Sequence, residues 1–363
     1  MNARLQRAAA RLRSGLPGAI HDTMHAATPG EAPRVVRRVM PPVVLNTLLG
    51  LVCAAAGALP AAAQDYPARP IRFIVSTAPG TTVDAAARYL GAKLGEEWGG
   101  AAVIVENRIG ANGAIASDFV AKSPADGYIL LFTAGSHYAT RWMVAKLPYD
   151  PVEDFRPVAR VGVAYLVLVV PSASKANLIA DLIADMKARP GDLVYSSAGN
   201  GSATHLSSVL LTSMAGVTAR HVPYKGAAQA LTDTIGGQVQ FTVAGIATAA
   251  GHIRAGRLKA LGVTGPKRSQ SLPDVPAIAE GGLAGYELTT MVGMLAPRVT
   301  PPAIVRKLSN ALIKLSSTPE YKAFAAAQGM EPDFADTDKF SAEAAPDLEH
   351  WRKVIALSGA KAD

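Results

Sequence analysis

The chain has 363 residues, of which 49% are hydrophobic and 18% charged, and its formal net charge is +8. This balance excludes a disordered or fibrous chain, and the length is enough to bury a large core in one or two domains. No stretch beyond residue 63 gathers lysines and arginines with aromatic residues, so a nucleic-acid surface is not expected.

Residues 1–63 have the order of a secretory signal. Three arginines precede the apolar run "PPVVLNTLLGLVCAAAGALP", which is followed by the small residues "AAA" and then "QDYP". The pattern predicts cleavage after Ala63 and export to the periplasm. A transmembrane anchor is the alternative, but Asn46, the glycines and Pro60 interrupt the run. The segment before Met40 is long for a signal, so the start of translation and the export route, general or twin-arginine, stay open.

The leader also holds the only cysteine and part of the basic charge. Cys53 lies within the apolar run, so the exported chain is expected to have no thiol, disulfide or cysteine-based metal site. Seven arginines and two acidic residues fall in 1–63, which leaves 29 basic against 26 acidic residues and a net charge of +3. The high net charge is therefore partly a property of the leader.

Past the leader, strand patterns alternate with helix patterns. The first half predicts strands over 71–76, 101–106 and 128–134 and helices over 81–98 and 113–122. Strands that alternate with helices indicate the α/β class, with a mainly parallel sheet flanked by helices.

The second half continues this alternation around two long apolar strands, 161–170 and 286–297. The remaining patterns predict helices over 178–188, from 203 onward, 227–235, 302–315, 319–328 and 339–357, and strands over 193–198, 218–222, 238–244 and 258–263. We interpret the two long strands as crossings between two lobes. One lobe is expected to comprise 64–164 plus 290–363 and the other 165–289. Ligand sites favour the cleft that such an arrangement creates.

The stretch "VYSSAGNGSATH", residues 194–205, has the pattern of a strand, a glycine-spaced loop and the start of a helix. Gly199 and Gly201 let backbone N–H groups approach a ligand closely, because glycine has no Cβ. The helix is expected to begin near Ser202, and helix N-termini attract anions. The stretch therefore predicts an anion-binding loop.

A second strand-to-helix loop, "STAPGTTVD", follows the strand 71–76 and opens a helix at Thr81. One such loop lies in each expected lobe, at the carboxyl end of a strand, where open α/β sheets bind ligands. Two helix N-termini facing each other across a cleft would clamp an acid at both ends with charge-assisted hydrogen bonds. The alternative is helix capping. Thr81 and Asp84 form a capping-box pattern, Ser202 is a common N-cap type, and Asp84 with Arg88 is an i,i+4 pair.

Blocks of sequence spread over residues 66–357 resemble the substrate-binding proteins of tripartite tricarboxylate transporters, the Bug family. They include "YPARPIRFIV", "VENRIGANG", "ADGYILLF", "KLPYDPVEDFRPVARV", "YSSAGNGSATHL", "HVPYKGAAQALTDTIGGQVQ" and "GMLAP", in the family's order. The resemblance implies a two-lobed periplasmic-binding-protein fold of type II. It further implies a small carboxylate ligand (an organic acid, an amino acid or an aromatic acid), a membrane permease as partner, and a monomer without cofactor or metal.

The resemblance also implies which residues line the ligand. They lie on the first loop, the loop after "YILLF", the glycine-rich loop and the strand after "GGQVQ", and are Thr77, Ala78, Gly80, Thr81, Asp84, Gly135, Ser136, His137, Ser197, Gly199, Asn200, Gly201, Ser202, His205 and Ala244. Four positions depart from the family pattern. Thr77 replaces an aromatic residue and Thr81 a glycine, while Ala244 replaces an aspartate and Met291 a tryptophan. Because these departures fall in the lining, ligand identity is the least transferable inference.

Two other classes of function compete with this hypothesis. Ser202, His205 and Asp84 can be drawn as a hydrolase triad, but the loop lacks the G-x-S-x-G elbow of α/β-hydrolases. The histidines are scattered without metal-ligand spacing, and no Walker or dinucleotide motif is present, so catalysis is not expected. A ligand-reporting protein that docks to a membrane sensor would use the same cleft, and the sequence leaves that alternative open.

Overall fold

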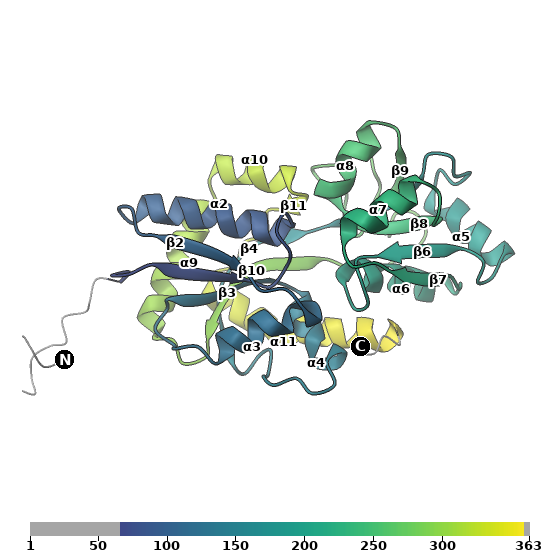
Figure 1. The fold of residues 1–363 in the computed structure, drawn as a ribbon. Helices are drawn as coiled ribbons and strands as arrows, with labels where there is room; N and C mark the ends of the chain where they lie inside the picture. Colours follow the sequence, from purple (N-terminus) through teal and green to yellow (C-terminus); the bar gives the residue numbers. More distant parts are fainter. Residues whose placement is uncertain (1–65, 359–363) are drawn as a thin grey trace, which may run out of the picture. The chain divides into compact units, whose positions relative to one another are not determined.

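The structure, a computed structural model, describes residues 66–358, which form two sheets flanked by helices (Figure 1). The expected leader, 1–63, lies outside the described residues. The α/β class predicted from the alternation is confirmed.

The first sheet has six strands in the order β11-β4-β10-β3-β1-β2. Their bounds are β1 (Ile71–Val75), β2 (Val103–Asn107), β3 (Ile129–Ala134), β4 (Phe155–Ala164), β10 (Thr290–Pro297) and β11 (Met330–Glu331). Strands β1 to β4 run in one direction, and β10 and β11 run in the other. The interior strands are apolar on both faces because helices cover both sides.

Seven helical elements belong to this first lobe. They are α2 (Thr82–Glu97), η1 (Ala111–Gly113), α3 (Ala114–Ala121), α4 (Ser136–Met143), α9 (Pro302–Ser316), α10 (Pro319–Ala327) and α11 (Thr337–Ser358). Helices α2, α9 and α10 share one hydrophobic cluster with one face of the sheet, and α3, α4 and α11 pack on the other face. The short β1–α2 loop is thereby held between a mostly buried strand and a helix with one buried face.

The second sheet has five strands in the order β7-β6-β8-β5-β9. Its strands are β5 (Leu166–Pro171), β6 (Val194–Ser197), β7 (Arg220–Pro223), β8 (Phe241–Gly245) and β9 (Leu258–Val263), and its helices are α5 (Ile179–Ala188), α6 (Ala203–Ala215), α7 (Ala227–Ile235) and α8 (Ile246–Arg254). Only β5 opposes the direction of the other four strands. Helices α5 and α6 cover one face, and α7 and α8 cover the other. Both lobes therefore have a sheet flanked by helices, as expected, but the sheets are mixed and not mainly parallel. Three of the five neighbouring strand pairs in the first sheet and two of the four in the second are antiparallel.

The first crossing between the sheets differs from the expected single strand over 161–170. It consists of β4 in the first sheet and β5 in the second, separated at Tyr165. The Tyr165 N–H donates to the carbonyl of Gly329 at 3.2 Å instead of joining either ladder. A Cβ at Gly265 would lie 2.0 Å from the Tyr165 ring, so the ring packs directly on backbone. The second crossing joins β9 to β10, which begins at Thr290 and not at residue 286.

The core continues from one lobe to the other along the C-terminal helix. Helix α11 packs against α4 of the first lobe and α6 of the second. One cluster of buried apolar side chains accordingly joins Leu131 of β3 with Phe241 of β8, and Trp351 of α11 belongs to it. The lobes are thus held together by packing at this side as well as by the two crossings.

Candidate functional site

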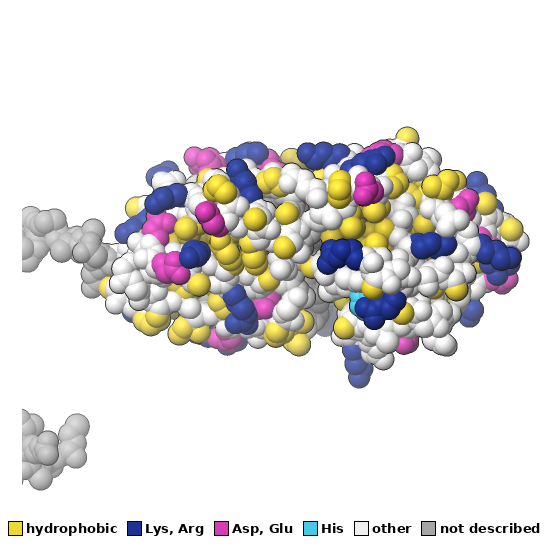
Figure 2. All heavy atoms as spheres, turned by 90° about the horizontal axis from the view of Figure 1, so that it is seen from above, with side chains coloured by type: hydrophobic (Ala, Val, Ile, Leu, Met, Phe, Trp, Pro, Cys, Tyr) yellow, Lys and Arg dark blue, Asp and Glu magenta, His cyan; other side chains and the backbone are white. Residues whose placement is uncertain are grey.

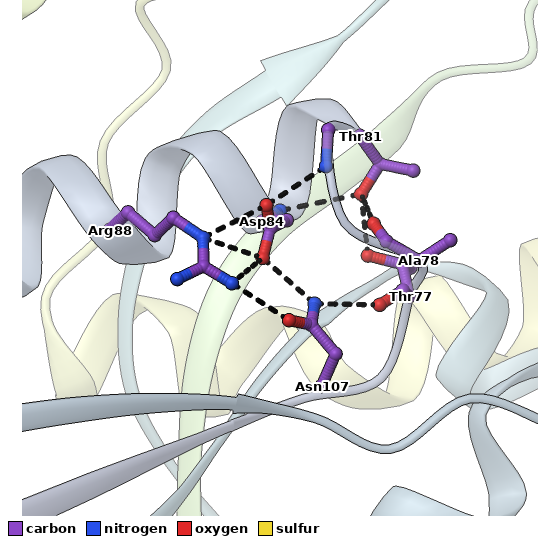
Figure 3. A network of polar contacts seen from close by, with 7 residues as sticks. Thr77, Ala78, Thr81, Asp84, Arg88 and Asn107 are labelled. Carbon is purple, nitrogen blue, oxygen red and sulfur yellow. Dashed lines mark hydrogen bonds and ion pairs between the residues drawn. The ribbon is translucent and has the colours of Figure 1, made fainter.

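The β1–α2 loop is ordered by hydroxyl groups (Figure 3). Thr81 is the N-cap of α2, and its Oγ1 accepts from the Asp84 N–H at 3.4 Å and donates to the carbonyl of Ala78 at 2.8 Å. The Thr77 and Thr81 hydroxyl oxygens lie 2.7 Å apart. Because the single Thr81 proton is directed to Ala78, Thr77 donates in this pair. The two threonines that depart from the family pattern are therefore bonded to each other.

Asp84 holds this loop in place because its carboxylate accepts hydrogen bonds. Its side chain is nearly fully buried and accepts from the Gly80 N–H at 2.9 Å, from Asn107 Nδ2 at 2.8 Å and from Arg88 Nε at 3.1 Å. Burial alone would raise the pKa of Asp84, but the hydrogen bonds from Arg88, Gly80 and Asn107 outweigh it and the pKa is lowered. An ionised carboxylate bonded in this way supports the loop and repels an anionic ligand, so it is not a contact for a carboxylate.

Asn107 extends this support from the end of the neighbouring strand β2. Its Nδ2 also donates to the carbonyl of Thr77 at 3.0 Å, and its Oδ1 accepts from Arg88 Nη2 at 2.8 Å (Figure 3). Asn107 was not among the residues predicted from the sequence, although it lies in the "VENR" block. Its part depends on the β1–β2 pairing, which sets Asn107 opposite Val75.

The glycine-rich loop between β6 and α6 satisfies most of its own N–H groups. Those of Gly199 and Gly201 donate to Ser197 Oγ and His205 Nδ1, each at 3.1 Å, and that of Ser202 donates to the Gly199 carbonyl at 3.2 Å. Ser202 is the N-cap of α6, and its Oγ accepts from the His205 N–H at 3.2 Å. The capping role left open by the sequence is thus present at both Thr81 and Ser202.

Donors remain at the first turn of each helix. In residues 66–358, no protein acceptor meets the backbone N–H of Thr82 or Val83 at α2, or that of Ala203 or Thr204 at α6. Such first-turn N–H groups carry the positive end of the helix dipole. Anion-binding capacity therefore resides mainly in the first turns and only to a small degree in the glycines.

A contact across the lobes joins the neighbourhoods of the two loops. Asn112 of η1 donates from Nδ2 to the carbonyl of Asn200 at 3.1 Å. A Cβ at Gly201 would lie 2.4 Å from Met143 Cε and 2.6 Å from Asn112 Nδ2. On the first-lobe side, the next residue, Gly113, packs on Ser76 at the start of the other loop. The two loops are thereby linked through three residues of η1 and α4.

The segment after β3 is the start of α4 and not the expected loop. The Gly135 N–H is shared between Thr290 Oγ1 at 3.0 Å and the Met291 carbonyl at 3.1 Å. The adjacent Ser136 is the first residue of α4.

His137 is buried in the aromatic core of the first lobe. Its Nε2 donates to the carbonyl of Pro151 at 2.8 Å, so its Nδ1 accepts from Ser117 Oγ at 3.0 Å. Burial lowers the pKa of His137 to about 4. With both ring nitrogens engaged, this side chain offers no group to a ligand, and we leave His137 out of the proposed contacts.

The remaining departures from the family pattern lie near the crossings. Ala244 on β8 is buried, pairs with Val167 of β5 and belongs to the same apolar cluster as Val163. Met291 on β10 pairs with Val163 of β4. These two positions place apolar side chains where the family commonly has an aspartate and a tryptophan.

The geometry provides no hydrolase relay. The Ser202 hydroxyl donates to the Gly199 carbonyl at 2.7 Å, the His205 Nδ1 receives the Gly201 N–H, and Asp84 is bonded to Arg88 in the other lobe.

Across residues 66–358, no three His, Cys, Asp or Glu side chains are grouped to hold a metal ion. Within the same span, no helix combines the length and apolar character that crossing a membrane requires. On the face shown in Figure 2, cationic and anionic side chains are interspersed.

Comparison with known sequences identifies a consistent group of relatives. Residues 87–359 match the family described as "Tripartite tricarboxylate transporter family receptor". The chain is 36% identical over 321 residues to Protein BugT of Bordetella pertussis, an alignment that covers 87% of this chain and 98% of BugT. It is also 36% identical over 291 residues to the UPF0065 protein in the tcbD-tcbE intergenic region of Pseudomonas sp. (strain P51), covering 80% and 86% of the two chains.

Solved structures show the same fold. Rpa4515 of R. palustris, solved with adipate, has 33% identity and a TM-score of 0.76, with 82% of this chain and 100% of that chain covered. The periplasmic binding protein BugD has 29% identity and a TM-score of 0.73, with 82% and 100% covered. MatC from Rhodopseudomonas palustris, with bound malate, has 26% identity and a TM-score of 0.71, with 80% and 100% covered.

Proposed function

The chain belongs to the tripartite tricarboxylate transporter receptor family, the Bug family of periplasmic solute receptors, and is a binding protein and not an enzyme. From this premise we propose that it captures a small organic acid with two carboxylates between its lobes and delivers it to a tripartite transporter. The lobes are proposed as residues 64–164 plus 290–363 and residues 165–289, with 1–63 as a cleaved export signal. The permease partner, the monomeric state and the periplasmic location of the mature chain are parts of the same proposal.

The observation that carries the proposal is the pair of capped helix N-termini. Each lobe supplies one strand-to-helix loop whose first-turn N–H groups have no protein acceptor, and contacts of Asn112 with Asn200 link the two neighbourhoods. An acid with a carboxylate at each end would receive charge-assisted hydrogen bonds from both lobes at once. A monocarboxylate would engage only one of the two ends.

The ligands of two structural neighbours support a dicarboxylate of short or medium length. Two structural neighbours were solved with adipate and malate, both of which carry two carboxylates. In this chain the Thr77–Thr81 hydroxyl pair occupies the first loop and adds polar groups beside the α2 terminus. We therefore propose a preference for acids that also bear a hydroxyl or other polar substituent.

The test is titration calorimetry of the mature protein with adipate, malate, succinate, citrate, glutamate and benzoate. A dicarboxylate that binds should raise the melting temperature, because binding the folded state alone adds about 2.7 kcal/mol at a hundredfold excess over Kd. The matched control is benzoate, a monocarboxylate. Tighter binding of benzoate than of every dicarboxylate would refute the two-ended clamp, and mass spectrometry of molecules released on denaturation would then identify the true ligand class.

A further inference from the structure

Two stacked imidazole rings lie beneath the glycine-rich loop. His205 projects from α6 and His221 from β7, and their ring centroids are 4.1 Å apart with planes inclined by 21°. Tyr195 of β6 lies beside both rings, with its centroid 4.9 Å from that of His221 and 6.4 Å from that of His205, because strand pairing sets Tyr195 next to His221. His205 is 7% exposed and His221 is part-buried, so the pair supports the loop largely from within.

Each imidazole contacts a different end of the loop. The Gly201 N–H donates to His205 Nδ1 at 3.1 Å, so this nitrogen carries no proton. His221 Nε2 lies 2.7 Å from Ser197 Oγ, and that hydroxyl contacts both the N–H and the carbonyl oxygen of Gly199 at 3.1 Å. Through these hydrogen bonds the two histidines hold the backbone of Gly201 directly and that of Gly199 through Ser197.

The two glycines are in conformations that need such support. Gly199 has φ +124° and Gly201 has φ +70°, both in the left-handed region that side chains disfavour. Their orientation sets where the first turn of α6 begins, because the Ser202 N–H closes back on the Gly199 carbonyl. A change in the pair would therefore move the N–H groups at the helix terminus.

We propose that His205 and His221, in their neutral forms, are the positioning residues of the second-lobe anion site. This inference rests on the proposed function, since it assigns how the α6 terminus is held for a carboxylate. Protonation of His205 at Nδ1 would set an N–H donor against the Gly201 N–H donor and break that end of the turn. Protonation of both rings would also place two like charges in stacking contact.

The surroundings keep His221 neutral near neutral pH. Burial lowers the pKa of His221 to about 4, and the His205 ring contributes in the same direction. The titratable groups in ring contact with His221 are His205 and Tyr195, and burial raises the pKa of Tyr195 to about 12, so this phenol stays uncharged.

Four substitutions distinguish a hydrogen-bonding role of the two histidines from a role of their side-chain volume alone. In His205→Asn, the amide oxygen can occupy the place of Nδ1 and accept the Gly201 N–H without titrating, whereas His205→Leu removes the acceptor. In His221→Gln, the amide can reach Ser197 as Nε2 does, whereas His221→Leu cannot. His252→Leu, on α8 of the same lobe, is the matched control, because the Nδ1 of His252 has no hydrogen-bond partner in the described structure.

The measurements are titration calorimetry with adipate and malate at pH 7, and the amide NMR signals of Gly199 and Gly201 without ligand. We expect the two leucine variants at 205 and 221 to bind about tenfold or more weakly and to shift these signals. The amide variants should stay within about threefold of the wild type.

Two outcomes would overturn the inference. One is an unchanged Gly201 signal and unchanged affinity in His205→Leu with the fold intact by circular dichroism. The other is equal loss in His205→Asn and His205→Leu, which would indicate a bulk role only. If the wild type binds neither acid, the proposed function fails on its own, and the Gly199 and Gly201 signals of the variants still decide the positioning role.

Discussion

Gly201 leaves room for two side chains of the other lobe, Met143 and Asn112, and a Gly201→Ala substitution should affect ligand affinity and stability by amounts that can be measured separately. The new Cβ would lie 2.4 Å from Met143 Cε and 2.6 Å from Asn112 Nδ2, both in the first lobe. These contacts exist only while the lobes meet, so the clash penalises the closed form that holds ligand. Displacing Asn112 would also lengthen its 3.1 Å bond to the Asn200 carbonyl, at a cost of about 1 kcal/mol.

The backbone adds a second cost that must be subtracted. Gly201 has φ +70°, where a side chain costs about 1 kcal/mol whether or not ligand is bound. Gly216→Ala is the matched control, because Gly216 has φ +62° and nothing within 4 Å of an added Cβ. Both variants should melt a few degrees lower, but only Gly201→Ala should weaken binding, by about tenfold.

Calorimetric titration with the acid that binds best, together with scanning calorimetry, measures the two effects separately. Equal ligand affinities of Gly201→Ala and Gly216→Ala, with equal melting temperatures of the two variants, would contradict this prediction. In that case the contact between the Gly201 loop and η1 would not be part of the ligand-bound form.

Three further outcomes follow from the described contacts. Asn112→Gly removes the amide but tolerates the φ of +53° at this position, so it should weaken ligand binding by a few-fold with little change in the melting temperature of the free protein, and equal losses of both would contradict a role of the Asn112–Asn200 contact in binding. Asp84→Asn should lower the free energy of unfolding at pH 7 by about 2 kcal/mol, as measured by chemical denaturation. The pKa of Asp84 is lowered in the folded state, so the ionised carboxylate stabilises the fold above its ordinary pKa, and this stability is lost in acid. Burial raises the pKa of Asp347 to about 6, so its stability contribution is present below pH 4 and lost as the pH rises through 6. Asp347→Asn should therefore gain about 1 kcal/mol over the wild type at pH 8 and nothing at pH 4, and a gain that is constant with pH would contradict this.

Local pattern predicted most of the elements but not the point where the chain changes sheets. Strand β9 and helix α7 have the bounds that the pattern gave, since each is a clear apolar or periodic run between turn residues. The run 161–170 showed no break because β4 and β5 are both buried on two faces, and only the tertiary partners of Tyr165 separate them. Helices α4 and α8 were missed because they are short and begin directly at the ends of β3 and β8.

The site divides in the same way between local and distant contacts. Thr81 and Ser202 were foreseen as possible caps because an N-cap bonds within three residues of itself. The roles of Asn107 and His221 depend on which strand lies beside which, and the contact of Asn112 with Asn200 joins residues 88 positions apart. No spacing along one chain carries that information. Pairings between strands and between lobes have to be known first.

From the sequence, helix capping and ligand binding were alternative roles of the two loops, whereas in the structure the two roles are compatible at each helix N-terminus. Each cap uses a side-chain oxygen to satisfy one N–H near the helix terminus, Asp84 N–H at Thr81 and His205 N–H at Ser202. That leaves the N–H groups of Thr82 and Ala203, one position after each cap residue, without an acceptor and fixed in direction. An anion that took the Gly201 N–H instead would have to displace His205 Nδ1 and would lose the turn that orients the terminus. An anion is therefore expected to bind at the first turns of the helices, where the hydrogen bonds of the loop stay intact and the helix dipole strengthens each new hydrogen bond.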